Sequence, residues 1–559
     1  MVCAVPDART TAWIAVFVVG MATIGRAQEH GPVATTLVDG DEPRDLPSRY
    51  SLAADTAIGR EELAAEPTFR TATVAESAGD FAPTVSPAAL TTATVAAAPA
   101  KPPPLPPSPY KDLYFDNDFS YLDNPDNTFF YLGDALKQRH PWPGATLDLG
   151  GEYRLRHQNE HNFRNSGSNL AGSFLVGQSD DFLLLRTRLF ADLKGAEWWR
   201  VYGEAIDAAS NFERAPSRTI EENRWDALNL FGDLLLYGDE NAKLWGRAGR
   251  QEQLYGAQRL ISPLDWSNTR RTFDGAKILW RGADWNIDGF WLRPVSFAQH
   301  AGNDHNFDAP DQSQEFIGLY ATNKKTKDRI YDFYYLRLTE YDAPGSAANP
   351  FDFDVNLFGA RWYGKQGSWL WEIEGGYQFG NFGAKIDSAG FYVVGLGHEL
   401  SDGPWKPTFW TYFDWASGTA DPNGRIHGTF NQLFPLSHKY FGFMDLVARQ
   451  NIQDANFLLT ATPTKNTRAL CWYHIFFLEE ARDALYNAAG VPIRSDPTGA
   501  AGRNVGQELD FTWQYIFSPR CDLLLGYSHF FEGRFVRATN PAGVDGNADF
   551  FYNQFTLRF

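Results

Sequence analysis

Arginine recurs at alternate positions in two stretches of the sequence. Arg154 and Arg156 stand in the first stretch, and Arg186 and Arg188 stand in the second. Residues two apart in an extended strand point to the same face, so each pair presents two guanidinium groups side by side. A guanidinium stays charged and matches the planar geometry of a carboxylate. Such pairs could bind a carboxylate-bearing solute, because rings of arginine or lysine are a usual means of selecting anions.

More arginines lie close together further along the chain, in and around a long connection. Arg247 and Arg250 are three residues apart, so a regular strand cannot place both on one face. A long loop that folds into the lumen of a barrel can form the constriction of a channel. If the strands enclose such a lumen, we expect its narrowest point between Gly249 and Gly275. The predicted substrate-binding residues are Arg154, Arg156, Arg186, Arg188, Arg250, Arg259, Arg270 and Arg271. Weaker candidates are Arg361, Arg449 and Arg468.

The same arginines have a plainer interpretation. Arginine and glutamate side chains can neutralise one another and simply fill the interior of a barrel. The carboxylates available for this role are Glu152, Glu204, Glu252, Glu372, Glu374 and Asp192. The aromatic side chain of Tyr202 could stack on a sugar face or only pack.

Other chemistry finds little support. The histidines are scattered, no Gly-x-Ser-x-Gly motif is present, and the adjacent Glu479 and Glu480 would point to opposite faces of a strand. Cys471 and Cys521 have no metal-ligand spacing, and a disulfide between them is possible but unsupported. The net charge of −18 argues against a nucleic-acid partner. We expect no enzyme, no cofactor and no metal site.

The elements that carry these residues follow a two-residue alternation typical of strands. We count about eighteen. The expected strands begin near Thr146, Phe182, Trp199, Trp225, Ala242, Thr272, Trp285, Glu315, Asp328, Asp354, Trp369, Ile386, Pro407, Met444, Asn466, Val505, Cys521 and Ala548.

Alternation alone does not separate a soluble sandwich from a membrane barrel. The connections do, because they are mostly long and short in turn: Glu160–Asp181 and Gln253–Arg271 are long, whereas Gly195–Trp198 is short. Short periplasmic turns and long outer loops are typical of outer-membrane barrels. Mean hydropathy of −0.38 excludes a bundle of membrane helices. An even strand number would leave both termini in the periplasm.

The part of the chain before residue 145 has a different character. Residues 1–27 are expected to be a signal peptide, because a short apolar run ends at Gly25-Arg26-Ala27, a small-x-small cleavage pattern. Residues 28–109, rich in Ala, Thr and Pro, are expected to be a disordered periplasmic linker. Residues 110–144 hold aromatic and acidic side chains and are expected to pack at the barrel entrance. The barrel itself is expected over residues 145–559.

The last residues form an amphipathic strand that ends in Phe559. A terminal phenylalanine on such a strand resembles the signal read by the outer-membrane barrel assembly machinery. Together with the leader and the alternating loop lengths, it predicts an all-β fold: a transmembrane antiparallel β-barrel of about eighteen strands with a disordered N-terminal extension.

From about Leu147 to Phe559 the sequence resembles the alginate export family of outer-membrane porins. The resemblance rests on five short stretches: Asp148–Arg156, Gly249–Gln251, Arg270–Gly275, Gly506–Asp510 and Gly526–Phe531. It gives Arg250 better motif support than Arg247. It implies an eighteen-stranded monomeric barrel with an arginine-rich channel that passes an anionic polysaccharide outward. The long N-terminal extension has no counterpart in the family pattern.

The resemblance implies an outer-membrane channel for a polyuronate-like polysaccharide. An uptake porin for small anionic solutes or sugars remains the alternative, and an adhesive barrel using its long loops is a third possibility. The expected partners are the anionic polysaccharide or another anionic solute, outer-membrane lipid and lipopolysaccharide, the assembly machinery through Phe559, and periplasmic export proteins.

Overall fold

The computed structural model describes residues 109–559 except 125–126, 128–129, 164–174, 297–306, 327, 342–351, 402 and 404. The expected signal peptide, and the expected linker apart from Pro109, lie outside the described residues. No helix in the described part of the chain is long and apolar enough to cross a membrane.

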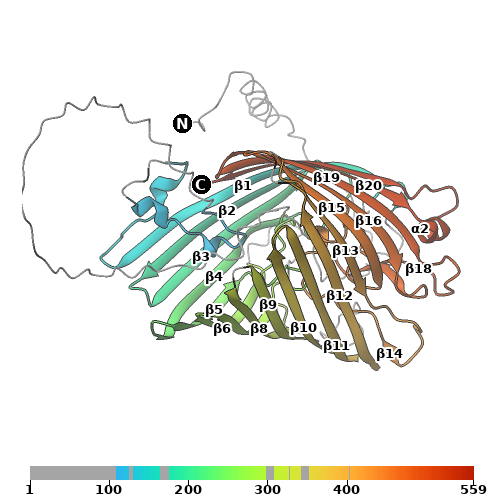
Figure 1. The fold of residues 1–559 in the computed structure, drawn as a ribbon, viewed down its shortest axis with the longest axis horizontal. Coiled ribbons are helices and arrows are strands. Elements are labelled where there is room, and N and C mark those ends of the chain that lie inside the picture. The colour runs from blue at the N-terminus through green and yellow to red at the C-terminus, as the bar shows by residue number, and fades with distance from the viewer. Residues whose placement is uncertain are drawn as a thin grey trace, which may run out of the picture. The chain divides into compact units, whose positions relative to one another are not determined.

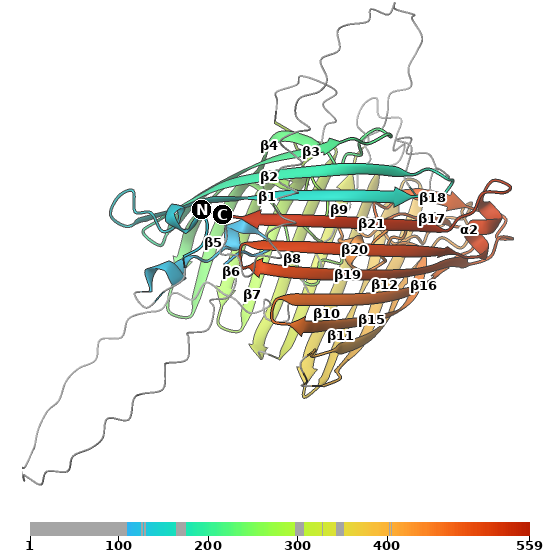
Figure 2. The same ribbon diagram turned by 90° about the horizontal axis from the view of Figure 1, so that it is seen from above.

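Eighteen long strands form one closed antiparallel barrel (Figure 1). Each strand pairs with the next, and β21 pairs back with β1 from Glu152 opposite Arg558 to His161 opposite Asp549. Figure 2 shows this closure, with β1 beside β21 and then β20 and β19. The predicted fold is confirmed. The strands are β1 (Ala145–His161), β2 (Asp180–Gly195), β3 (Trp199–Asn211), β4 (Asn223–Gly238), β5 (Ala242–Gln251), β6 (Phe273–Gly282), β7 (Trp285–Pro294), β8 (Gln314–Thr326), β9 (Arg329–Glu340), β10 (Phe353–Gln366), β11 (Trp369–Phe382), β12 (Lys385–Glu399), β13 (Thr408–Ala416), β15 (Ile452–Thr464), β16 (Thr467–Leu478), β19 (Asn504–Ser518), β20 (Cys521–Glu532) and β21 (Ala548–Arg558).

The remaining elements are short. The strand β14 (Ile426–His427) pairs in parallel with β12, and β17 (Ala484–Tyr486) pairs with β18 (Pro492–Ser495). The single-turn 3-10 helices are η2 (Tyr114–Asp116), η3 (Ser120–Asp123), η4 (Asp134–Leu136) and η5 (Ser437–Lys439), and α2 is Arg534–Thr539.

The two faces of each strand separate as the alternation predicts. On β1 the apolar Leu149 and Tyr153 are each 37% exposed, whereas Glu152 and Arg154 are 3% and 2% exposed. The exposed apolar side chains form the outer surface of the barrel, so the charged face points inward. This is the arrangement of a barrel whose outer surface meets lipid.

One strand prediction is wrong. The strand expected near Met444 begins at Ile452, whereas the other predicted starts agree with the structure to within about two residues, inside the usual boundary error. Residues before Ile452 fold inside the barrel: the backbone N–H groups of Phe434 and Ala488 donate to Leu260 and Asp445. Met444 and Val447 would point to opposite faces of a strand, yet both side chains are buried there. The apolar sequence therefore serves an inward loop and has no lipid-facing side.

Two long connections fill much of the interior. Residues 252–272 join β5 to β6, residues 428–451 lead into β15, and an isolated parallel bridge joins Ile261 to Phe434. Their apolar side chains share one core with inward residues of the wall, such as Leu336 and Leu357. We call these connections the first and the second inward loop.

The segment before β1 packs against the end of the barrel where β1, β3 and β5 begin. Its Phe115 contacts inward aromatic side chains of the wall, and its Arg139 forms an isolated bridge with Leu147. The Asp134 carboxylate pairs with Arg520 in the β19–β20 turn. This segment therefore lies at the end that carries the short turns.

Candidate channel site

Arg154 and Arg186 lie opposite one another on β1 and β2 and both reach the first inward loop. Arg154 donates to the carbonyl oxygens of Asp265 at 2.6 Å and of Ser267 at 3.0 Å. Arg186 donates to the same carbonyls at 3.0 and 3.1 Å, and to the carboxylates of Glu152 and Asp265 at 2.7 and 2.8 Å. Hydrogen bonds from charged donors are the strong ones, so these two arginines hold the loop inside the barrel.

Arg188 and Arg270 extend this group toward β3. Arg188 Nε lies 2.7 Å from Glu204 Oε1, and its Nη2 lies 3.8 Å from Glu252 Oε2. Arg270, on the loop itself, pairs with Glu252 and with Asp265. The structure thus brings loop and wall arginines together around shared carboxylates.

Arg156 completes the group. Its guanidinium lies 3.5 Å from the centre of the Trp266 ring and donates to the Trp266 carbonyl oxygen at 2.8 Å. Among the described residues, this set brings five guanidinium groups together with four carboxylates. Arg558 Nε also lies 3.7 Å from Glu152 Oε2. We call this set the lumenal arginine cluster: Arg154, Arg156, Arg186, Arg188 and Arg270 with Glu152, Glu204, Glu252 and Asp265.

The other two loop arginines lie outside this cluster. Arg259 crosses the interior to β11, where it pairs with Glu372 at 2.7 Å and Glu374 at 3.0 Å. Arg271 donates to the carbonyl oxygens of Ser262 and Pro435, and so ties the two inward loops together.

Arg250 occupies a different place from the one the sequence predicts. Arg247 is buried in the interior, with its guanidinium 3.8 Å from the centre of the Phe231 ring, whereas Arg250 lies on the opposite face of β5. Its register partner Leu230 is 58% exposed on the outer surface. The choice of Arg250 over Arg247 as the inward residue is therefore wrong.

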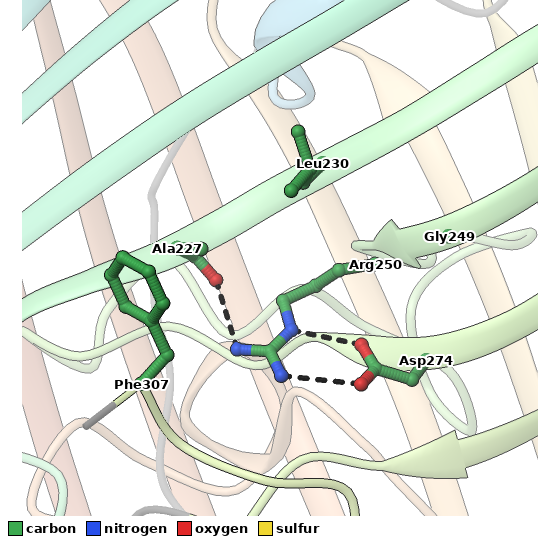
Figure 3. A pocket seen from close by; sticks show the side chains of 6 residues that line it. All are labelled: Ala227, Leu230, Gly249, Arg250, Asp274 and Phe307. Carbon is green, nitrogen blue, oxygen red and sulfur yellow. Dashed lines mark hydrogen bonds and ion pairs between the residues drawn. The ribbon is translucent and has the colours of Figure 1, made fainter.

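Figure 3 shows Arg250 in a recess of the barrel's outer face. The recess has a volume of about 360 Å³, and its lining includes the exposed side chain of Phe307. Arg250 pairs with Asp274 at 2.8 Å and donates to the carbonyl of Ala227 at 3.3 Å. Beside it, Gly249 has φ +127°, and a Cβ there would lie 2.2 Å from a backbone oxygen. Gly249 thus permits close packing of β5 against β4. Arg250 pairs with a carboxylate, that of Asp274, on the face of β5 that points away from the lumen.

A model of the alginate export family matches residues 145–547, which is most of the chain and nearly all of the barrel. The chain belongs to the alginate export family. The match starts at the first residue of β1.

Among solved structures, OccD3 (OpdP) of Pseudomonas aeruginosa is 10% identical over 73% of this chain and 91% of its own, with a TM-score of 0.47. A BenF-like porin from Pseudomonas fluorescens Pf-5 is 10% identical over 74% and 98%, also with a TM-score of 0.47. No curated protein sequence matches the chain significantly.

Membership of the alginate export family, together with the closed barrel, places the protein in the outer membrane as a channel. The lumenal arginine cluster therefore lies inside the barrel of an outer-membrane channel. Its side chains are nearly shut off from water, since Arg186 and Arg188 are each 1% exposed. In this alginate export protein the arginines contact loop carbonyls and carboxylates. A binding role for them, predicted from the sequence, requires the first inward loop to move.

Of the weaker candidates, Arg361 pairs with Glu372 at 2.8 Å and Asp332 at 3.2 Å. Arg449 pairs with Asp414 at 2.6 Å. Arg468 lies on β16 opposite Gln514. Two of these three therefore belong to buried ion pairs of the interior.

The histidines of the interior pair with neighbouring aspartates. His474 Nδ1 lies 2.8 Å from Asp454 on the adjacent strand, and His438 Nδ1 lies 2.9 Å from Asp445 within the second inward loop. In the portion of the chain that is described, no group of three or more His, Cys, Asp and Glu side chains is placed to hold a metal ion.

The sequence prediction missed the groups that hold the arginines in place. The carbonyl and the carboxylate of Asp265, the carbonyl of Trp266 and the hydroxyl of Tyr114 all contact this region. One signal was available: Leu264 and Trp266 are large apolar residues in a connection that should otherwise be polar. Such residues indicate a loop that folds inward.

Proposed function

We propose that the protein passes an anionic polysaccharide with a carboxylate on each sugar, a polyuronate, through the barrel. The observation that carries the proposal is the lumenal arginine cluster, in which five guanidinium groups face four carboxylates. The clustered guanidinium groups favour anions, and the paired carboxylates keep the binding of each sugar acid weak enough to release it. Multiple weak sites are what conduction requires.

The carboxylates of the cluster also indicate how a polymer would be accepted. Glu152 and Asp265 hold Arg186 through bonds of 2.7 and 2.8 Å. A sugar carboxylate presents the same chemical group, so it can replace Asp265 on Arg186 when the loop withdraws. Exchange of one carboxylate for another avoids leaving a buried guanidinium without an acceptor, which would be costly.

The test is ion current through the purified full chain in a planar bilayer. We expect anion selectivity, and a decrease in current when a polyuronate is added but not when a neutral polysaccharide is added. The variant Arg188→Gln should weaken the block by about ten- to a hundred-fold, since a hydrogen bond to a charged group is worth about 1.5–3 kcal/mol.

The matched control is Arg250→Gln, because Arg250 lies on the outer face beside the exposed Leu230. Polyuronate should block the current through Arg250→Gln at the same concentrations as in the unaltered chain. Cation selectivity would contradict the proposal. Anion selectivity without block by polyuronate would favour the other candidate, an uptake porin for small anionic solutes.

A further inference from the structure

Three inward aromatic side chains form a row across adjacent strands near the end where the chain enters the barrel. Phe190 on β2 and Tyr202 on β3 have ring centres 6.1 Å apart with planes 16° apart. Tyr202 and Phe231 on β4 have centres 5.3 Å apart with planes 23° apart. The three rings therefore form one nearly continuous aromatic platform on the lumen wall.

Two guanidinium groups lie over this platform. Arg200 is 5.3 Å from the centre of the Tyr202 ring, and Arg247 is 3.8 Å from that of Phe231. Their carboxylate partners are Asp192 and Asp233, each at 2.7 Å. Both arginines come from the wall, so their positions do not depend on any loop.

The chain's own segment before β1 covers the platform. Phe115 packs edge-on against Tyr202 and Phe231, with ring centres 5.8 and 5.1 Å away. Phe119 lies parallel to Phe190, with planes 7° apart. These two rings belong to the apolar cluster that buries the platform.

Polar groups of the segment also occupy donors of the wall. The Phe115 carbonyl accepts from Arg200, and the Asp112 carbonyl accepts from Arg270 at 2.9 Å. The Tyr114 hydroxyl donates to Glu152 at 2.5 Å, and burial raises its pKa, which keeps it a donor. The segment thus presents apolar rings to the platform and oxygen acceptors to the arginines.

The strands that close the barrel do not include the cover. The strand ladder closes between β1 and β21 without it, and the segment's local structure here consists of single-turn helices. Apart from the backbone bridge between Arg139 and Leu147, its attachment is made largely by side chains. One of these is Lys137, whose ammonium lies 4.8 and 4.9 Å from the ring centres of Phe119 and Phe190. Burial lowers the pKa of Lys137 to about 8.

We propose that Phe190, Tyr202 and Phe231, with Arg200 and Arg247, form a binding site for the uronate units of the transported polymer. In the structure the chain's own residues 112–119 occupy this site. The apolar face of a sugar ring packs on an aromatic face, and the sugar carboxylate pairs with a guanidinium, as carboxylates commonly do. A polymer arriving at this end of the barrel therefore displaces the segment as it binds.

This inference rests on the proposed function, and its test separates the two. Ser120 is exposed on the segment, and Cys471 on β16 is only partly buried, whereas Cys521 is buried. A full chain carrying Ser120→Cys and Cys471→Ser is labelled with an environment-sensitive dye. The dye signal and the bilayer current are then recorded as a hexameric oligouronate, or a neutral oligosaccharide of equal length, is added.

We expect the oligouronate, and not the neutral sugar, to change the dye signal over the concentrations that block the current. Phe115→Ala should lower the concentration needed for both effects on the order of tenfold, because its aromatic contacts compete with the ligand. Phe231→Ala should raise it again in the Phe115→Ala background. The control Phe358→Ala, on the outer surface at 56% exposure, should change neither.

Current block without any change at the dye would overturn the inference and leave the proposed function standing. An equal response to the neutral sugar would also overturn it. The inference would also be overturned if Phe115→Ala and Phe231→Ala left the blocking concentration unchanged. Absence of block in every variant, with ion current intact, would instead remove the proposed function.

Discussion

Asp414→Leu is expected to lower the free energy of unfolding by about 3–5 kcal/mol. The Asp414 carboxylate on β13 accepts from Arg449 of the second inward loop at 2.6 Å, and the two side chains are 3% and 1% exposed. Without the carboxylate, the guanidinium stays buried with its charge uncompensated. The cost should appear in urea titrations of the detergent-solubilised barrel, followed by tryptophan fluorescence and by the shift of folded protein in gel mobility.

Two comparisons make this result specific. The ion pair between Arg337 and Asp354 has a similar distance, 2.7 Å, but its side chains are 37% and 38% exposed. Asp354→Leu should therefore cost no more than about 1 kcal/mol. Combining Asp414→Leu with Arg449→Met should recover most of the loss, because a buried ion pair can be replaced by apolar groups at little cost. Equal losses in the buried and exposed variants would contradict the argument.

The strands were predictable because one physical rule governs them. Each strand places alternate residues against lipid and against the interior, so Leu149 and Tyr153 mark one face of β1 and Glu152 and Arg154 the other. The same rule indicates Arg247 as the inward residue of β5, since Leu244, Gly246 and Ala248 form a small apolar set on the opposite face. The motif around Arg250 outweighed that alternation and led to the wrong choice.

The contents of the lumen were not predictable by the same means. The inward loops have no repeating period, and their positions depend on contacts far apart in the sequence, such as Ile261 with Phe434 and Arg259 with Glu372. The sequence identified the arginines and most of their carboxylate partners. It did not indicate that the arginines bind the backbone of a loop, because carbonyl acceptors carry no sequence signal.

The second prediction with a large effect concerns the first inward loop. Replacing residues 253–271 by a turn of a few residues should increase the ion current severalfold and keep it anion-selective. The replacement is geometrically simple, because Gln251 and Phe273 are register partners at the ends of β5 and β6. A short hairpin turn can therefore join the two strands directly.

The expected increase follows from what the loop covers. Its carbonyl and carboxylate groups at Asp265 occupy Arg154 and Arg186, and Trp266 covers Arg156. Without the loop these side chains face water. On that wall four guanidinium groups, of Arg154, Arg156, Arg186 and Arg188, then remain against the three carboxylates of Glu152, Glu204 and Glu252.

The same replacement should reduce stability without preventing folding. It removes Leu260, Ile261 and Leu264 from the core, and each fully buried side chain of this size contributes about 1.5–3 kcal/mol. The strand ladder that closes the barrel is untouched. The control is the same operation on residues 533–547, which carry α2 and join β20 to β21. If that deletion raises the current as much, the first inward loop is not what limits conduction. If only the deletion of 253–271 does so, the narrowest point lies where the arginines of the wall meet this loop.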